Sequence, residues 1–405
     1  MDGGFSGTHN KVNISRSVNI PDPVKLTRYK KAPEFGPRIL FFSGGTALNP
    51  LSRALVRYTH NSIHLVTPFD SGGSSAKLRN AFQMPAVGDM RSRLMALADQ
   101  SVKGNPEIYS LFVHRLPKDT HNHKLRNTLN RMSEGRHPLV RGILEPMRTI
   151  VQGYISAFIQ KMPVDFDLRG ASIGNLILTA GYFHHNRHID PVIFLFSKLA
   201  EVRGTVRPIM NRHLHLIAHL EDGSIIPGQH ALTGKEYPPI DSRVQRLYLS
   251  GSLEKPAPLQ PRLKSKVSRL IHEAELICYP MGSFYTSLIA NLLPRGVGAA
   301  IAENDCPKIY IPNTEHDPEQ MGTSLSGRVQ ILLYYLKRSA EEKTPDNKLL
   351  NFVLIDRQKE IYQGGVDVRA IEEKGIQVIE APLAASGKNM YLDENFLIER
   401  LLSMI

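Results

Sequence analysis

The chain has 405 residues, of which 41% are hydrophobic and 22% charged, with a formal net charge of +12. This composition is typical of a globular protein, and no apolar run approaches the ~18 residues that a membrane-spanning helix needs. Two cysteines and no visible signal peptide indicate a reduced, cytoplasmic protein without a disulfide framework. The positive charge suits nucleic acid or a phosphate-bearing ligand, but no basic stretch is interleaved with aromatic residues, which argues against a nucleic-acid groove.

The opening of the chain predicts a βαβ unit. Residues 1–37 are polar, contain four prolines and show no periodicity, so we expect an irregular leader. Residues 38–43 are a continuous apolar run that predicts a buried strand, and apolar residues at helical spacing follow from 48 to 58. A second strand is predicted over 62–67, and two strands joined through a helix imply a parallel sheet.

The rest of the chain continues this alternation. The later elements that we expect are a helix over 88–99, a mainly helical insertion over 100–170, a helix from 174, a β-hairpin around Asp222-Gly223, strands over 276–279, 307–311 and 351–355, and a terminal helix over 392–405. Together they predict a Rossmann-like α/β fold, in which helices flank a parallel sheet and the helical insertion and the hairpin are additions. We expect one such domain over 38–340, completed by residues 341–405.

Three loops share one design, in which an apolar strand is followed by glycine, a hydroxyl residue and a helix. They are Gly44-Gly45-Thr46, Gly72-Gly73-Ser74-Ser75 and Gly282-Ser283-Phe284-Tyr285-Thr286-Ser287. Glycine lets backbone N–H groups approach a phosphate, and a helix N-terminus adds partial positive charge. One such loop is common in ordinary proteins, whereas three in one α/β chain predict an anion-binding site. Neither a Walker A motif nor a complete G-x-G-x-x-G fingerprint occurs, which argues against a P-loop kinase and against NAD.

Two carboxylates, Asp70 and Asp89, stand next to these loops in the sequence. Paired carboxylates beside a polyphosphate would suit Mg²⁺, which bridges phosphate oxygens and a few protein oxygens. The alternative is that Asp70 caps a helix and that Asp89 is an ordinary first-turn charge. Both interpretations stay open at this point.

Two groups of histidines are not assigned to a metal site. His184 and His188 share a predicted helix face, but neither a glutamate at the spacing of a zinc motif nor a cysteine accompanies them. His213, His215 and His219 alternate along a predicted strand, and we expect them to form its exposed polar face.

Taken as a set, the motifs resemble the CofD/YvcK family. The resemblance covers roughly residues 38–340 and rests on Ser43-Gly44-Gly45-Thr46, Asp70-Ser71-Gly72-Gly73-Ser74-Ser75 with Leu78-Arg79, Gly88-Asp89-Met90-Arg91, Gly174-Asn175, the hairpin around Glu221-Asp222-Gly223, Gly282 to Ser287 with Asn291-Leu292, and Pro307 to Asn313. It implies a Rossmann-like fold in which the three glycine loops, including Tyr285 and Thr286, and Arg91 bind the nucleotide phosphates. It also implies that Asn175 and Asn313 contact a base, a ribose or a sugar.

The resemblance implies two functions. One branch of the family resembles 2-phospho-L-lactate transferase, which moves phospholactate from a guanosine diphosphate-linked donor to a deazaflavin precursor with Mg²⁺ and releases GMP. The other branch binds UDP-sugars and acts in carbon metabolism and cell shape. The Ser-Gly-Gly-Ser-Ser loop is closer to the second branch, and Ser71, Ala47 and Pro280-Met281 depart from the family pattern of Asp-Asp-Gly-Gly, Gly-Gly-Thr-Gly and Gly-Pro-Gly-Ser.

The first expectation is therefore a transferase that moves a phospho-acyl-type group from a nucleotide diphosphate-linked donor to a hydroxyl acceptor. Asp70 and Asp89 would hold Mg²⁺ on the diphosphate, because positioning and charge stabilisation dominate such reactions. The alternative is a non-catalytic, UDP-sugar-binding regulatory protein. We expect a GDP- or UDP-linked small molecule as the ligand, and neither a membrane nor nucleic acid as a partner; a homodimer stays open.

Overall fold

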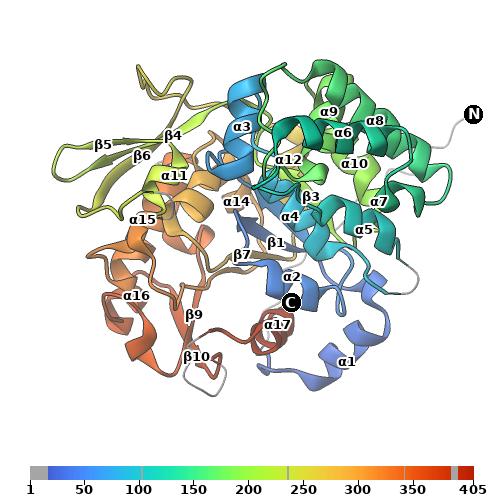
Figure 1. Cartoon of the computed structure of the whole chain (residues 1–405). Helices are drawn as coiled ribbons and strands as arrows, with labels where there is room; N and C mark the ends of the chain where they lie inside the picture. Colours follow the sequence, from blue (N-terminus) through green and yellow to red (C-terminus); the bar gives the residue numbers. More distant parts are fainter. Residues whose placement is uncertain (1–16, 102–103, 235–236, 342, 385–390) are drawn as a thin grey trace, which may run out of the picture.

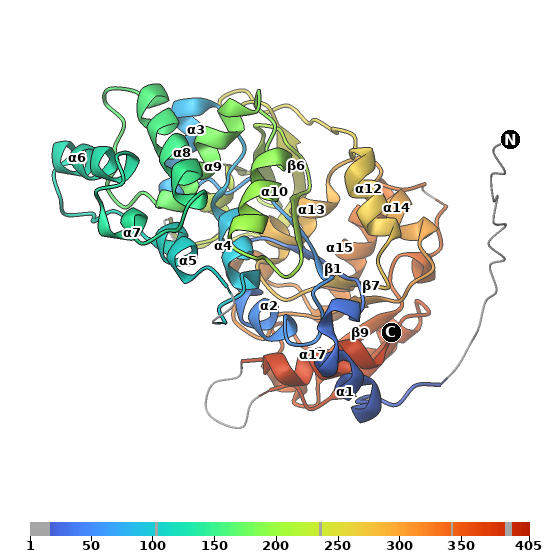
Figure 2. The same cartoon turned by 90° about the vertical axis from the view of Figure 1, so that its right-hand side faces the viewer.

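The structure, a computed structural model, describes residues 17–101, 104–234, 237–341, 343–384 and 391–405. Its centre is a seven-stranded parallel sheet flanked by helices (Figures 1 and 2). The strands are β1 (Ile39–Ser43), β2 (Ile63–Val66), β3 (Thr205–Pro208), β7 (Leu276–Tyr279), β8 (Lys308–Tyr310), β9 (Phe352–Asp356) and β10 (Gln377–Ala381). This architecture confirms the predicted Rossmann-like α/β fold.

The order of the strands contains one reversal. It reads β10-β9-β8-β7-β1-β2-β3, so the chain starts at β1, builds β2 and β3 on one side, and returns to build β7 on the other. All neighbours in this sheet pair in parallel. In open α/β sheets, ligands bind outside the carboxyl ends of the strands at such a reversal. The fold therefore points to the edge of the sheet where β1 and β7 end.

Whether a strand could be predicted from the sequence depends on how far its residues are buried. Every residue of β1, β2 and β7 is buried, which matches their continuous apolar character. The two edge strands, β3 and β10, were not expected. β10 exposes Gln377 and Glu380, and β3 contains Arg207 and Pro208. Edge strands pair on one side only, so they do not need an apolar run.

Helices cover both faces of the sheet. They are α1 (Pro23–Lys31), α2 (Asn49–Leu55), α3 (Gly73–Phe82), α4 (Gly88–Leu97), α5 (Pro106–Val113), α6 (Asn122–Ser133), α7 (Pro138–Arg141), α8 (Met147–Lys161), α9 (Ile173–His184), α10 (Asp190–Leu199), α11 (Gln229–Leu232), α12 (Ser265–His272), α13 (Ala290–Leu292), α14 (Val297–Glu303), α15 (Leu325–Arg338), α16 (Val368–Glu372) and α17 (Glu394–Ser403). Helices α5 to α8 occupy the stretch predicted as a helical insertion. Within the described ranges, no helix combines the length and apolar character needed to cross a membrane.

The expectation of an irregular leader is wrong at α1. The Asp22 carboxylate accepts a hydrogen bond from the Lys25 N–H at 3.0 Å, and Pro23 occupies the first helical position. Lys25 Nζ donates to the carbonyl oxygens of Ser403 and Ile405 at 3.1 and 3.0 Å, which ties α1 to the end of α17. Only Leu26 of this helix is buried, so hydrophobic periodicity could not reveal it.

The predicted hairpin is confirmed and belongs to a small antiparallel sheet. This sheet consists of β4 (His215–Leu220), β5 (Ile225–Pro227) and β6 (Val244–Ser250), in the order β5-β4-β6. The strand β6 was not expected. Apolar side chains of β4 and β6 join the same buried cluster as α15, so the small sheet lies over one face of the large one.

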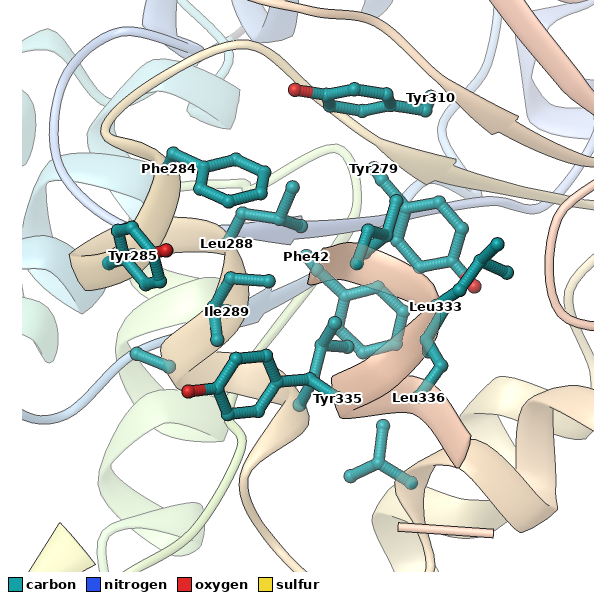
Figure 3. Packing of buried hydrophobic residues seen from close by; sticks show 14 of the residues in the cluster. Phe42, Tyr279, Phe284, Tyr285, Leu288, Ile289, Tyr310, Leu333, Tyr335 and Leu336 are labelled. Atoms are coloured by element: carbon teal, nitrogen blue, oxygen red, sulfur yellow. The ribbon is translucent and has the colours of Figure 1, made fainter. Parts of the chain in front are cut away.

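Two hydrophobic clusters cover opposite faces of the parallel sheet. On one face, Phe42 and Tyr279 stack with ring centroids 5.8 Å apart and pack with Leu336 and with the π-helical segment Phe284–Ile289 (Figure 3). On the other face, alternate residues of the same strands pack against α2 and α17. A third cluster unites α3 to α10 into a helical lobe beside β2 and β3. Elements from both faces and from this lobe can therefore meet at the carboxyl edge of the sheet.

Candidate functional site

A cavity of about 830 Å³ lies at the carboxyl ends of β1, β2, β7 and β8. This is the place that the strand reversal indicates. The cavity brings together most of the predicted site residues, namely Gly44, Gly45, Thr46, Asp70, Gly72, Gly73, Ser74, Ser75, Asp89, Arg91, Asn175, Gly282, Ser283 and Asn313. Tyr285 and Thr286 do not line it.

The first glycine loop packs tightly against Ser287 of the third loop. A Cβ atom on Gly44 would lie 2.4 Å from Ser287 Oγ, so only glycine allows this close approach. Arg93 Nη2 donates to the carbonyl oxygens of Gly44 and Gly45 at 3.4 and 3.3 Å, and Nη1 donates to Ser52 Oγ at 2.5 Å. Burial lowers the pKa of Arg93 to about 10, so the guanidinium still carries its charge at neutral pH. Arg93 thus holds the loop by its carbonyl groups.

The second glycine loop has the same kind of support. Arg79 Nη1 donates to the carbonyl oxygens of Phe69 and Asp70 at 2.6 and 3.1 Å, and burial lowers the pKa of this arginine to about 10. Gly73, with φ of +45°, is the first residue of α3. The N-cap residue is Gly72, which has no side chain with which to cap this helix. Gly72, Gly73, Ser74 and Ser75 line the cavity, so the positive end of the α3 dipole lies at its wall.

Asp70 and Asp89 both lie against the glycine loops. Asp70 Oδ1 accepts a hydrogen bond from the Gly72 N–H at 3.1 Å, while its Oδ2 would be 3.3 Å from a Cβ atom on Gly88. Asp89 is in the first turn of α4, and its Oδ1 would be 3.9 Å from a Cβ atom on Gly45. The two carboxylates thus flank the cavity beside the first and second loops. Asp89 is the first-turn charge of the alternative interpretation, whereas Asp70 accepts from the turn before α3 and is not its N-cap, which is Gly72.

The helical lobe joins the second loop through Arg91 and Asn175. Arg91 Nε donates to Asn175 Oδ1 at 3.0 Å, and Arg91 Nη1 donates to the carbonyl oxygen of Phe112 at 3.3 Å. Asn175 Nδ2 lies 3.5 Å from Ser74 Oγ. A side chain on Gly174 would collide with Arg91, because its Cβ would lie 2.8 Å from Arg91 Cδ. These contacts orient polar groups of α4 and α9 toward the loop at the start of α3.

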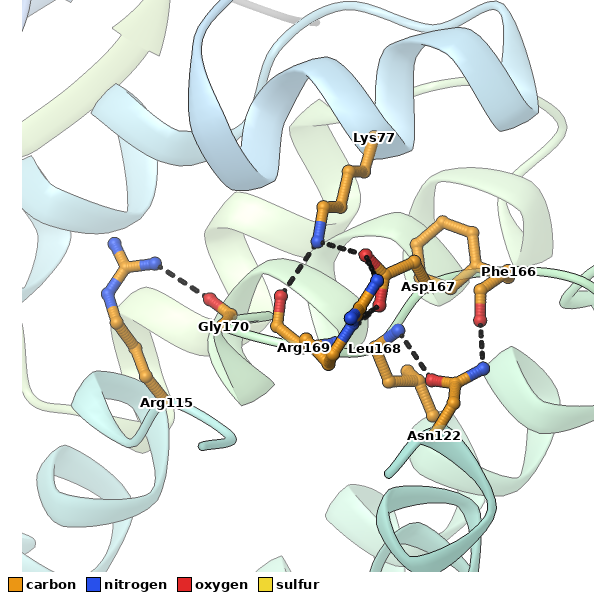
Figure 4. Close-up of polar contacts among 8 residues, drawn as sticks. All are labelled: Lys77, Arg115, Asn122, Phe166, Asp167, Leu168, Arg169 and Gly170. Atoms are coloured by element: carbon orange, nitrogen blue, oxygen red, sulfur yellow. Dashed lines mark hydrogen bonds and ion pairs between the residues drawn. The ribbon is translucent and has the colours of Figure 1, made fainter. Parts of the chain in front are cut away.

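The lobe also contributes Arg115, which the sequence analysis did not select. Arg115 lines the cavity, and its Nη1 donates to the carbonyl oxygen of Gly170 at 3.2 Å (Figure 4). In the same loop, Asp167 and the carbonyl group of Arg169 accept hydrogen bonds from Lys77 of α3, both at 2.8 Å. Lys77 and its partners tie the lobe to α3, and Arg115 adds a guanidinium on the lobe side of the cavity.

The third glycine loop differs from the other two. The Phe284 N–H donates to Asp317 Oδ2 at 2.8 Å, and the N–H groups of Tyr285 and Thr286 donate to Glu319 Oε2 at 2.8 and 2.9 Å. Thr286 Oγ1 donates to Glu319 Oε1 at 2.6 Å. Burial raises the pKa of both carboxyl groups, and for Glu319 the neighbouring Asp317 adds to the effect.

These contacts contradict the expected phosphate-binding roles of Tyr285 and Thr286. Both side chains are buried, and the Tyr285 hydroxyl donates to the carbonyl oxygen of Val244 at 3.2 Å. Their backbone N–H groups are already bound to a carboxylate of the protein itself. Of the third loop, only Gly282, Ser283 and Ser287 line the cavity.

The expected exposed histidine face is also wrong. His213 Nδ1 lies 2.8 Å from the carbonyl oxygen of Met84, and His215 Nδ1 lies 3.3 Å from Arg79 Nη2. Both rings are half-buried, and burial lowers the pKa of His215 to about 4. The side chains face α3 rather than solvent, because β4 packs alongside the second loop.

The donor set is compatible with Mg²⁺ held jointly with a phosphate ligand. In the described part of the chain, no group of three or more His, Cys, Asp or Glu residues could hold a metal by itself. Mg²⁺ commonly binds one or two carboxylates and completes its shell with water and substrate phosphates. Asp70 and Asp89 beside the first two glycine loops fit that pattern. The cavity lining also contains more carboxylates than guanidinium groups, the carboxylates being Asp70, Asp89, Glu315, Asp317 and Glu394 and the guanidiniums Arg91 and Arg115.

Several lining residues come from elements that the sequence analysis did not connect with the loops. Gln229, His230 and Thr233 belong to α11 or follow it, and Tyr391, Leu392 and Glu394 come from the start of α17 and the segment before it. No local pattern marks them, because they reach the cavity only through packing of the whole chain. For Arg93 a signal was present, since it stands four residues after Asp89 and thus one helical turn away.

Comparison with known proteins agrees with this architecture. The chain is 30% identical over 287 residues to a gluconeogenesis factor of Bacillus subtilis (strain 168), covering 70% of this chain and 69% of that protein. It is 26% identical over 354 residues to a gluconeogenesis factor of Listeria monocytogenes, covering 85% of this chain and 88% of that protein. A crystal structure of a UPF0052 family member from Bacillus halodurans has the same fold, with a TM-score of 0.65 and 23% identity over 91% of this chain and 99% of that one.

The family model described as 2-phospho-L-lactate transferase CofD matches residues 39–384. The match extends beyond residue 340, where the sequence analysis placed the end of the resemblance, and takes in β9 and β10. It contains the three glycine loops, both carboxylates and α11. The chain therefore belongs to the 2-phospho-L-lactate transferase CofD family.

Proposed function

We propose that the chain binds a nucleoside diphosphate-linked small molecule in the cavity together with Mg²⁺, and transfers a phospho-acyl-type group from it to a hydroxyl acceptor. The observation that carries this proposal is the convergence of the first two glycine loops with Asp70 and Asp89 in one cavity at the strand reversal. The cavity volume of about 830 Å³ lies within the usual range of ligand sites and leaves room for a donor and part of an acceptor.

Each part of the cavity has a role in this proposal. The first and second loops bind the diphosphate through backbone N–H groups, and Arg79 and Arg93 keep those loops rigid by holding their carbonyl groups. Asp70 and Asp89 hold Mg²⁺, which supplies charge neutralisation at the diphosphate. Arg91 and Arg115 face the same space and bind phosphate oxygens from the lobe side.

A second candidate, a regulatory protein that binds a UDP-sugar without turnover, is favoured by two observations. The relatives from Bacillus subtilis and Listeria monocytogenes are named gluconeogenesis factors. Ser71 stands where the family pattern has a second aspartate, and its side chain bonds to His230 and does not line the cavity. In this candidate the same cavity binds the ligand, and the consequence is a change of conformation or partner in carbon metabolism.

A turnover assay separates the two candidates. The purified chain is incubated with Mg²⁺, a phospholactate-type GDP-linked donor and a hydroxyl acceptor of the deazaflavin-precursor class, and the release of GMP is followed. Acceptor-dependent GMP release that disappears in Asp70→Asn supports the transferase. Binding of UDP-N-acetylglucosamine without any release of nucleoside monophosphate, with or without Mg²⁺, supports the regulatory protein and contradicts the transferase.

A further inference from the structure

A second crevice lies along β6, an edge strand of the small antiparallel sheet. Its walls are residues 247–249 of β6, residues 258–260, residues 292–293 and the C-terminal turn of α15. The lining is mainly apolar, and Leu259 is 43% exposed. The crevice shares no lining residue with the cavity at the strand reversal, so it is a separate feature of the surface.

The edge of β6 is closed to the addition of a further strand at this crevice. The Leu247 N–H donates to Tyr335 Oη at 2.7 Å, and the carbonyl oxygen of Leu249 accepts a hydrogen bond from the Leu259 N–H at 2.8 Å. These are backbone groups that an edge strand would otherwise offer to an added strand. A partner at this place therefore contacts side chains rather than extending the sheet.

Two arginines border the crevice from β6 and α15. Arg338 lines it directly, and the guanidinium carbon of Arg246 lies 5.3 Å from the centre of the Tyr248 ring, which is another lining residue. Burial raises the pKa of the Tyr335 hydroxyl to about 12, and the charges of Arg338 and Arg246 oppose this shift. Both guanidiniums therefore lie near the same lining side chain.

Two further arginines continue this border. Arg262 and Arg295 each follow a lining residue by two positions, and their backbones pair in an isolated parallel bridge. The Gly296 N–H donates to the carbonyl oxygen of Ser339 at 3.0 Å, which brings Arg295 next to the end of α15 and to Arg338. The side chains of Arg246, Arg262 and Arg295 are exposed, and that of Arg338 is half-buried.

This border carries positive charge without an internal counter-charge. In the part of the chain that the structure describes, the ion pairs of arginine involve other residues than these four. Residues 255–272, which run beside the crevice into α12, contain five Lys or Arg and no Asp or Glu. The apolar crevice with its four arginines, here called the arginine crevice, is therefore complementary to a surface that combines carboxylates with an apolar side chain.

We propose that the arginine crevice docks an acidic segment of another protein. An apolar side chain of that segment fills the crevice against Leu259, and carboxylates on either side of it pair with the arginines, whose planar guanidiniums suit carboxylates. Nucleic acid fits less well, because phosphates would leave the apolar lining uncovered. Tyr248 and Tyr335 are buried, so neither ring is available for stacking on a base.

The test uses a defined peptide and the full chain. The probe is fluorescein-labelled Glu-Glu-Leu-Glu-Glu-Leu-Glu-Glu, and its binding is followed by fluorescence anisotropy. We expect saturable binding that weakens as the salt concentration rises. Replacing both leucines of the peptide with alanine should weaken binding by about three- to tenfold, because apolar contact with the crevice is lost. Replacing its glutamates with glutamine should abolish binding.

A pair of double variants locates the binding on the chain. Arg262→Ala with Arg295→Ala should weaken peptide binding by about tenfold, the effect of two exposed ion pairs. Arg131→Ala with Arg141→Ala is the matched control, since it removes the same charge from exposed positions of α6 and α7 and should change binding by less than about twofold. Thermal unfolding verifies that both variants are folded.

Several results would overturn the proposal. These are failure of the peptide to bind the unaltered chain, equal losses in the two double variants, and equal binding of the leucine and alanine peptides. Tighter binding of an eight-nucleotide single-stranded DNA, with the same loss in the Arg262 and Arg295 variant, would assign the surface to nucleic acid instead. Self-association in sedimentation that disappears in this variant would assign it to a second copy of the chain.

Discussion

In the second glycine loop, Gly72 and Gly73 lead into α3, and they line the cavity together with Ser74 and Ser75. In the third loop, Gly282 and Ser283 lead into the π-helical segment Phe284–Ile289, whose first N–H groups are bound by Asp317 and Glu319. The two loops follow the same pattern of strand, glycine, hydroxyl residue and helix. The second loop lines the cavity, whereas the first N–H groups after the third loop are bound by carboxylates of the protein itself.

The difference shows that an anion-binding helix start is decided by residues outside the motif. Asp317 and Glu319 stand about thirty positions after the third loop, and they place a carboxylate where a phosphate would otherwise bind. Because these N–H groups are bound internally, the third loop stabilises the fold and offers only Gly282, Ser283 and Ser287 to the cavity. We therefore expect the ligand to bind at the first and second loops, and the variants below test this expectation.

The largest effect is expected from removing the internal carboxylate of the third loop. Glu319→Ala leaves the buried N–H groups of Tyr285 and Thr286 and the Thr286 hydroxyl without their partner. We expect a loss of about 3–5 kcal/mol in the free energy of unfolding, measured by urea denaturation. Glu372→Ala, at an exposed position of α16, is the control and should change it by less than about 0.5 kcal/mol. Equal stability of the two variants would contradict the capping role of Glu319.

A second variant adds a methyl group against the second loop and Asp70. In Gly88→Ala the new Cβ would lie 2.5 Å from Ser75 Oγ and 3.3 Å from Asp70 Oδ2, so both groups must move. Such overpacking typically has an unfavourable effect of about 1–3 kcal/mol, and we expect the affinity for GDP with Mg²⁺ to fall by about 10- to 100-fold in calorimetry.

The matched control for this change is Gly153→Ala. Gly153 lies in α8, and its Cβ would meet no atom within 4 Å. Alanine is the better helix former, so this variant should gain about 0.5–1 kcal/mol of stability and bind GDP as the unaltered chain does. If Gly88→Ala also binds GDP normally, the ligand does not depend on the second loop and Asp70.

A third variant tests the metal. Asp70→Asn keeps an oxygen that can accept the Gly72 N–H but removes the negative charge. We expect the affinity for GDP in the presence of Mg²⁺ to fall about tenfold, to the level measured with EDTA, because one of the two metal-binding carboxylates is lost. If Mg²⁺ strengthens GDP binding to this variant as much as to the unaltered chain, Asp70 does not bind the metal and only accepts the Gly72 N–H.

The smallest effects are expected when one hydroxyl group is removed from the second or from the third loop, and these two variants compare the loops directly. Ser74→Ala, in the first turn of α3, should weaken GDP binding by about three- to tenfold, the usual effect of one hydrogen bond. Ser283→Ala, at the capped third loop, should weaken it by less than about twofold. Equal losses at both positions would mean that the third loop binds phosphate despite Asp317 and Glu319.

The sequence revealed those parts of the fold that local patterns determine. The buried strands β1, β2 and β7 were predicted from apolar runs, the first two glycine loops from their place after strands, and Asp70 and Asp89 from their closeness to these loops in the sequence. The edge strands β3 and β10 were not predicted, because a strand that pairs on one side only does not need an apolar run. Arg93 was missed although its place one helical turn after Asp89 was a signal. Glu319 could not be assigned, because its contacts with the third loop exist only after distant elements have packed together.

The central claim is that the first two loops and their carboxylates bind a nucleoside diphosphate through Mg²⁺. Calorimetric titration of the unaltered chain with GDP, GMP, UDP and UDP-N-acetylglucosamine, each with and without Mg²⁺, tests this most directly. We expect the diphosphates to bind, Mg²⁺ to strengthen their binding by at least about tenfold, and GMP to bind more weakly because it lacks the second phosphate. Failure of all four compounds to bind, or equal binding of GMP and GDP without any effect of Mg²⁺, would contradict the account.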